Sequence, residues 1–209
     1  MPDIFDLASW VGAVAFALSG YLIGARKNLD IMGIFIVSML TANGGGVVRD
    51  VLVGQMPILL HDVFAFLLVG GVVLVSMGLK LHKKENLEHH TLFLISDSLG
   101  LVAFSVTGAL VGIDANLSVF GVMLLAFITA TGGGFLRDIL LKEIPFILSS
   151  DFYGTIALIV GALLYMLHQL GWDSQAVVTI VFIAALLIRL IAWKHKWRLP
   201  KIGPDITSK

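Results

Sequence analysis

The chain has 209 residues, of which 58% are hydrophobic and 13% are charged, whereas soluble domains carry about 25% charged residues. This composition indicates an integral membrane protein. The formal net charge is zero, which argues against nucleic acid as a partner, and the lack of cysteine excludes disulfides, thiol catalysis and cysteine-ligated metals.

Apolar runs of nearly the length that crosses a bilayer as a helix, about 20 residues, follow one another along the chain. We predict an all-α membrane protein whose seven transmembrane helices lie at Leu7–Ala25, Ile31–Val48, Val63–Leu79, Thr91–Ile113, Ala115–Leu136, Phe152–Leu170 and Gln175–Trp193. We expect one membrane domain over residues 1–209, divided into a first repeat at 4–84, a linker at 80–90, a second repeat at 91–171 and a last helix at 174–197.

The two halves of the chain repeat each other with an offset of 88 residues. Residues 12–64 match residues 100–152 without a gap at 21 of 53 positions, and the matches include glycines, a proline and an Arg-Asp pair. Shared apolar composition would scatter leucine and valine matches but would not align these residues in one frame. Since each repeat holds three predicted spans, the second copy enters the membrane the other way up, as in the inverted repeats of many transport proteins.

Basic residues predict the orientation of the chain. If the N-terminus is outside, the inner segments hold 13 of the 14 basic residues, among them Lys27, Lys142 and Arg189, and only Arg49 is left outside. This distribution follows the positive-inside rule. We therefore predict that the N-terminus lies outside the membrane and the C-terminus on the cytoplasmic side.

The central motif of each repeat is a triple glycine followed by Arg-Asp, in TANGGGVVRD (residues 41–50) and TATGGGFLRD (residues 129–138). Three glycines in a row disfavour an unbroken helix, and a break at membrane depth is tolerated where it lines a water-filled cavity. Close packing of two helices is the alternative. We favour a break that kinks each helix, and we predict a pore constriction at Gly44, Gly45, Gly46, Gly132, Gly133 and Gly134, lined by Ser19, Thr41, Asn43, Thr107, Thr129 and Thr131.

Charged residues near the glycines are the candidates for tuning this pore. Arg49 with Asp50, and Arg137 with Asp138, are either interfacial charges or groups that approach each other near the pseudo-twofold axis. Asp97 lies within an apolar run, where a carboxylate is by default a cation or proton site.

Other chemistry finds little support in the sequence. The six histidines lie at run ends or in loops without ligands at metal spacing, so we expect no metal site and no cofactor. No set of nucleophile, base and oxyanion donors argues for an enzyme. The tail after Trp193 mixes tryptophan with basic residues and predicts an anchor to membrane lipid.

The doubled GGGxxRD motif, the two three-span repeats and the additional last span resemble the TRIC family, the trimeric intracellular cation channels, in its prokaryotic form. The resemblance covers nearly the whole chain. It implies a homotrimer in a prokaryotic plasma membrane that conducts K⁺, Na⁺ and other monovalent cations through one pore in each subunit. It places that pore between the second and fifth spans, at Gly44–Gly46 and Gly132–Gly134. Animal members carry a lysine motif after the first glycines, where this chain has Val47-Val48-Arg49.

Two functions are consistent with these patterns. A passive cation channel would use glycine carbonyls and threonine hydroxyls to replace part of an ion's hydration shell. A secondary transporter of a small zwitterion such as glycine would hold the carboxylate and the ammonium at half-helix ends, with Asp97 coupling protons.

Overall fold

The structure is a computed structural model that describes residues 4–83, 86–149, 152–195 and 197. Within these residues every regular element is helical. The elements in chain order are α1 (Ile4–Arg26), α2 (Ile31–Leu52), the 3-10 helix η1 (Ile58–Leu60), α3 (Val63–Gly78), the 3-10 helix η2 (Leu81–Lys83), α4 (Asn86–Asp114), α5 (Val119–Leu140), α6 (Phe146–Ser149), α7 (Tyr153–Gln169) and α8 (Gln175–Lys194).

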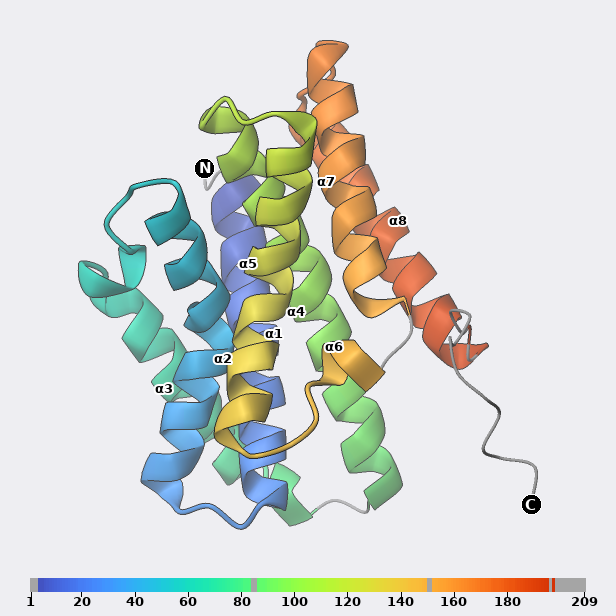
Figure 1. The fold of residues 1–209 in the computed structure, drawn as a ribbon. Coiled ribbons are helices and arrows are strands. Elements are labelled where there is room, and N and C mark those ends of the chain that lie inside the picture. The colour runs from blue at the N-terminus through green and yellow to red at the C-terminus, as the bar shows by residue number, and fades with distance from the viewer. Residues whose placement is uncertain (1–3, 84–85, 150–151, 196, 198–209) are drawn as a thin grey trace.

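The long helices form one bundle in which consecutive helices run in opposite directions (Figure 1). The loops after α2, α4 and α7 lie at the same end as the start of α1, and the connections after α1, α3 and α5 lie toward the other end. Five helices (α1, α2, α5, α8 and residues 90–114 of α4) are long and apolar enough to cross a membrane. Since α3 and α7 have 16 and 17 residues, the number of spans stays a prediction.

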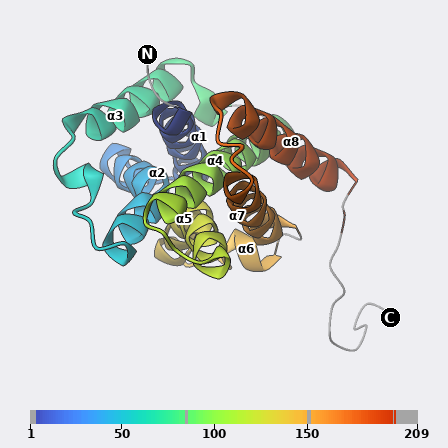
Figure 2. The same cartoon turned by 90° about the horizontal axis from the view of Figure 1, so that it is seen from above.

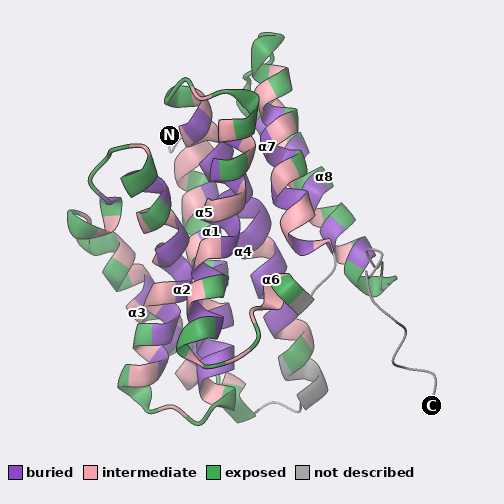
Figure 3. Ribbon diagram, viewed as in Figure 1, coloured by how far each residue is buried: buried purple, intermediate pink, exposed green. Residues whose placement is uncertain are grey.

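Burial separates central from peripheral helices. Seen from above, α1 and α4 lie in the middle of the bundle, with α3 and α8 at its edge (Figure 2). In the most apolar part of α4, 78% of the residues are buried within the protein, against 28% in α8. Many residues of α3 and α8 are exposed (Figure 3). Large apolar side chains such as those of Leu74 and Ile180 are among them. Such side chains suit lipid or another subunit, not water.

Turn chemistry explains why the helices end where they do, and it repeats with the sequence. Asn28 and its repeat mate Asn116 both adopt left-handed backbone angles after α1 and α4, a conformation that asparagine tolerates. Two residues later, the side chains of Asp30 and Ser118 accept from the backbone N–H groups of the third residue of α2 and α5.

The predicted linker at 80–90 is partly wrong. The helix α4 already begins at Asn86, so the second half of that segment is helical and α4 extends beyond the predicted run. The segment Asn86–His90 contains leucine and glutamate, which favour helix, and no glycine or proline to stop one.

Candidate functional site: the glycine crossing and its two arginine clusters

The two triple glycines lie where α2 and α5 cross. A Cβ atom on Gly45 would collide with the carbonyl oxygen of Thr129, and a Cβ atom on Gly133 would collide with that of Thr41. On Gly44 it would lie 2.9 Å from Leu136 Cδ1. The two backbones therefore touch at the crossing, which only glycine permits.

The predicted interruption of each helix is wrong, whereas the predicted kink at the glycines stays a prediction. Both α2 and α5 stay helical through their glycines, from Ile31 to Leu52 and from Val119 to Leu140. Each glycine costs about 1 kcal/mol relative to alanine in a helix, and the close approach of two antiparallel helices offsets that cost. Packing, the alternative considered for the motif, accounts for the first two glycines of each triplet.

The third glycine of each triplet has a different environment. The nearest atom to a Cβ on Gly46 would be Arg49 Nη2 at 3.8 Å, and for Gly134 the nearest would be Arg137 Nη2 and the Tyr153 hydroxyl, both at 3.6 Å. These glycines face the arginine of their own repeat and leave space there.

Buried hydroxyls surround the crossing, but most bond to their own helix. Thr41 and Thr129 are fully buried and donate to the carbonyls of Val37 and Leu125, four residues earlier, at 2.7 and 2.6 Å. The Thr131 hydroxyl and the Asn43 amide also donate to carbonyls four residues earlier, those of Phe127 and Met39, and the Thr107 hydroxyl donates to the carbonyl of Phe104, three residues earlier. Such bonds satisfy the hydroxyl internally and tend to bend helices.

The first cluster, called the Arg49 cluster, consists of Phe5, Arg49, Asp50 and Ile58. Arg49 Nε and Nη2 lie 2.8 and 2.7 Å from Asp50 Oδ1. Asp50 Oδ2 accepts from the Ile58 backbone N–H at 3.0 Å, and the Phe5 ring lies under the guanidinium at 5.6 Å. The pair is buried, so each charge is compensated where water cannot screen it.

The second cluster, called the Arg137 cluster, consists of Ser19, Phe93, Asp97, Arg137 and Asp138. Arg137 Nε donates to Asp138 Oδ1 at 2.7 Å, and Phe93 takes the place that Phe5 has in the first cluster, 5.1 Å from the guanidinium. Arg137 Nη1 also donates to Asp97 Oδ1 at 2.9 Å and to the Ser19 hydroxyl at 2.7 Å. The Phe146 backbone N–H donates to Asp138 Oδ2 at 2.7 Å, as Ile58 does to Asp50.

The hypothesis that the two Arg-Asp pairs approach each other is wrong. Because Thr41 contacts Gly133 and Thr129 contacts Gly45, the helices are antiparallel there, and Arg49 and Arg137 lie at opposite ends of the contact. Twelve helical residues separate the two levels, which corresponds to about 18 Å along the axis. Each arginine is neutralised by carboxylates on its own side.

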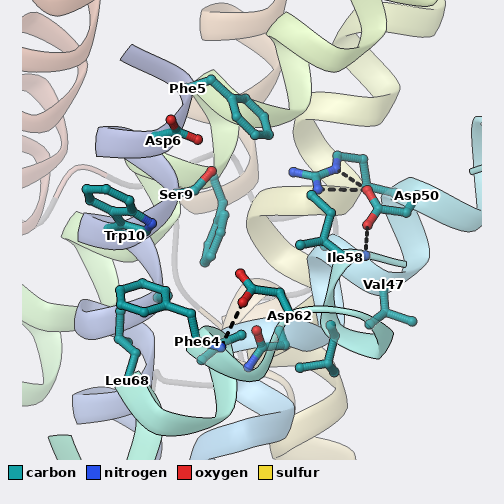
Figure 4. Close-up of a pocket in the computed structure, with 18 residues that line it drawn as sticks. Phe5, Asp6, Ser9, Trp10, Val47, Asp50, Ile58, Asp62, Phe64 and Leu68 are labelled. Atoms are coloured by element: carbon teal, nitrogen blue, oxygen red, sulfur yellow. Dashed lines mark hydrogen bonds and ion pairs between the residues drawn. The ribbon is translucent and has the colours of Figure 1, made fainter. Parts of the chain in front are cut away.

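A cavity of about 150 Å³ opens beside the Arg49 cluster, between α1, α2 and α3 (Figure 4). Asn43 and Gly46 line it from α2, and the polar side chains of Asp6, Ser9 and Asp62 line it from the other elements. A second cavity, of about 350 Å³, shares the Arg49 cluster and extends to Gln55 and Asp114. Carboxylate and amide oxygens next to a compensated arginine suit a hydrated cation better than an anion.

Two residues of the site were missed by the sequence analysis. Arg189 was counted with the cytoplasmic basic residues, but it is 2% exposed, and its guanidinium lies 5.0 Å from the ring centre of Tyr153, which is also 2% exposed. A single charge inside the last apolar run was the available signal for Arg189. Among the described residues no three histidine, aspartate or glutamate side chains group closely enough to hold a metal ion.

Comparisons with known proteins agree over nearly the whole chain. A sequence model of a family described as "Glycine transporter" matches residues 6–79 and 94–169. A membrane protein of Deinococcus radiodurans is 34% identical over 91% of this chain and 88% of its own length. The corresponding values are 30%, 94% and 95% for the membrane protein YvgT of Bacillus subtilis, and 29%, 93% and 94% for the inner membrane protein YadS of Escherichia coli.

Solved structures give the same result. A crystal structure of a prokaryotic TRIC channel in 0.5 M KCl superposes with a TM-score of 0.86 at 30% identity, covering 94% of this chain and 98% of the other. The TRIC trimeric intracellular cation channel orthologue from Rhodobacter sphaeroides superposes with a TM-score of 0.86 at 29% identity, covering 93% and 100%.

Proposed function

The chain belongs to the TRIC channel family, in its prokaryotic form, and from this premise we propose that it is a channel for monovalent cations. It is an integral membrane protein. We infer a homotrimer with one pathway in each subunit, since the orthologue from Rhodobacter sphaeroides is described as trimeric. The permeant ion on this proposal is K⁺, with Na⁺ also passing, and no cofactor takes part.

The proposed membrane topology has seven spans, with two inverted three-helix repeats (α1 to α3, and α4, α5 and α7) followed by α8. The alternating helix directions support it, because α1 and α4 start at opposite ends of the bundle. The connections that hold Lys27 and Lys142 lie together at one end of the bundle. There Lys27 forms an ion pair with Glu143, the residue after Lys142. Under the positive-inside rule this end is cytoplasmic, which places the N-terminus outside.

The observation that carries the proposal is the presence of buried polar groups on both sides of the crossing, namely the Arg49 cluster with its cavity and the Arg137 cluster, which together are called the polar column. The Arg49 cavity reaches the third glycine of α2, and the Arg137 cluster lies beside the third glycine of α5 on the far side of the contact. Each arginine is compensated by carboxylates, so the column does not present a net positive barrier to cations. A path from Asp6 and Asp62 past Gly46, across the crossing and on to Asp97 joins these features.

Filling the cavity at Gly46 tests this path. The variant Gly46→Leu places a side chain into the cavity without a backbone collision, since the nearest atom is 3.8 Å from the Cβ position. We expect K⁺ flux into liposomes to fall at least about tenfold, which corresponds to ~1.4 kcal/mol on the barrier. The matched control is Gly71→Leu on the exposed face of α3, where no atom lies within 4 Å and flux should be unchanged. Equal flux in both variants would remove Gly46 from the path.

Secondary transport of a small zwitterion is the alternative, because Arg137 and Asp97 place a guanidinium and a carboxylate side by side. In this structure the two groups form a hydrogen bond with each other. This pairing favours a structural role in a closed channel over a site that binds substrate. Saturable uptake of glycine that depends on a pH gradient and is lost in Asp97→Asn would support transport. Ohmic current would support the channel.

A further inference from the structure

At one position near the third glycines, the two repeats carry side chains of very different size. Ala65 of α3 lines the Arg49 cavity, and in the 88-residue frame its mate is Tyr153 at the start of α7. The surrounding positions correspond: Phe5 and Phe93 both lie against the arginine, and Ile58 and Phe146 both donate a backbone N–H to the aspartate. A small side chain therefore leaves a cavity in the first repeat, where the second repeat has a large one.

Tyr153 occupies the space that would match the Arg49 cavity. Its ring is buried and packs edge-on against Phe146, with the ring centres 5.3 Å apart and the planes at 88°. Its hydroxyl comes to the open side of Gly134, 3.6 Å from the Cβ position. The Tyr153 hydroxyl, Asp97 Oδ2 and Arg137 Nη2 are buried, and none of the three makes a hydrogen bond of good geometry to the described residues.

If the Tyr153 ring moved aside, a cation would reach the polar groups of the Arg137 cluster. Asp97, Asp138 and Arg137 carry a formal charge of −1 together, whereas Asp50 and Arg49 carry none. The difference arises because Asp97 has Ser9 as its mate in the first repeat. When the Arg189 guanidinium, which lies over the ring, also moves away, displacement of Tyr153 opens a polar space whose remaining charge favours a cation over an anion.

The ring of Tyr153 is held by a residue outside the repeats. The Arg189 guanidinium of α8 lies 5.0 Å from the ring centre, and Arg189 is 2% exposed. The attraction between a cation and an aromatic face is strongest when both groups are removed from water, as they are here. The first repeat has no helix that corresponds to α8. The contact between Arg189 and Tyr153 therefore acts on the second repeat alone.

We propose that Tyr153 closes the cation path on the Arg137 side, and that Arg189 is the positioning residue through which α8 keeps it closed. The proposal rests on the channel function inferred above. When α8 moves and separates the Arg189 guanidinium from the ring, Tyr153 can move away from Gly134 and Asp97. The second repeat then gains a cavity like the one beside Ala65 in the first repeat.

The first test measures the opening itself, independently of current. Since the chain has no native cysteine, Gly134→Cys introduces a single thiol next to the Tyr153 hydroxyl. In purified full-length protein, we expect Arg189→Met to raise the labelling rate of that thiol by a membrane-impermeant methanethiosulfonate about tenfold. Tyr153→Ala, which copies the first repeat, should raise it at least as much. Arg189→Lys keeps a cation over the ring and should restore slow labelling.

The second test is single-channel recording without the cysteine. Arg189→Met should raise the ratio of open to closed time about tenfold, equivalent to ~1.4 kcal/mol, and leave the unitary conductance unchanged. The effect should vanish in the Tyr153→Ala background, because two residues in one contact are not additive. Tyr165→Phe, about three turns further along α7, is the control and should match the wild type.

The outcomes separate this proposal from the channel function. Slow labelling in both Arg189→Met and Tyr153→Ala, in protein that elutes as the wild type, overturns the proposal even if the wild type conducts. Additive effects of the two substitutions on open time also overturn it. If labelling responds as expected but the wild type passes no current, the closing role of Tyr153 stands and the channel function fails.

Discussion

The contact between the two helices at the middle glycines makes a quantitative prediction about stability. Replacing Gly133 with alanine gains about 1 kcal/mol of helix propensity. It also places a methyl group on the carbonyl oxygen of Thr41, a backbone atom that cannot rotate away. Overpacking of this kind costs about 1–3 kcal/mol, and a backbone obstacle puts Gly133→Ala at the upper end of that range. We therefore expect net destabilisation of about 1–2 kcal/mol.

The same substitution at the third glycine should act in the opposite direction. Gly46→Ala gains the same propensity, and its methyl group meets no atom closer than 3.8 Å. Thermal unfolding of the two variants in detergent compares them directly. A difference of about 2–3 kcal/mol corresponds to at least about 4 °C in Tm for a chain of this size, with Gly46→Ala the more stable. Equal Tm values would refute the division of roles between the glycines.

Three further predictions concern charge and space. Asp97→Asn leaves the buried Arg137 with Asp138 alone and should cost about 3 kcal/mol of stability, measured by chemical denaturation, while Ser9→Asn, at the mate position, should cost less than about 1 kcal/mol. Ala65→Tyr should fill the Arg49 cavity and reduce K⁺ flux about tenfold, ~1.4 kcal/mol, without loss of fold, and unchanged flux would argue against a path through that cavity. The Lys27 ammonium lowers the pKa of the Glu143 carboxyl in the loop after α5. The pair therefore stabilises the fold above the ordinary glutamate pKa of about 4.3 and is lost as the pH falls through the lower folded value. Thermal melts of Lys27→Met should lack this acid-dependent decrease.

Sequence reasoning reached the helical membrane architecture because apolar runs and turn residues act locally. Local sequence alone is enough to locate the seven apolar runs, which overlap helices of the structure. It also explains the left-handed backbone angles of Asn28 and Asn116. The linker was misjudged because a charged segment can be helical when nothing in it stops a helix, as Asn86–His90 shows.

The site was predicted only in part, for tertiary reasons. The glycine motif was located correctly, but the break was not, because the energy that keeps Gly45 and Gly133 helical comes from a partner helix 88 residues away in sequence. Asp97 was singled out from its depth in an apolar run, yet its pairing with Arg137 and Ser19 is visible only in the fold. Tyr153 had no local signal, and its role follows from comparing it with Ala65 once both are placed.

The most direct test of cation conduction is a planar-bilayer recording of the purified wild-type protein in asymmetric KCl. The account predicts discrete current steps that reverse close to the K⁺ equilibrium potential, because the carboxylates along the path compensate both arginines and favour cations. Currents that reverse at the Cl⁻ potential, or a silent bilayer from protein that is folded and inserted, would contradict it.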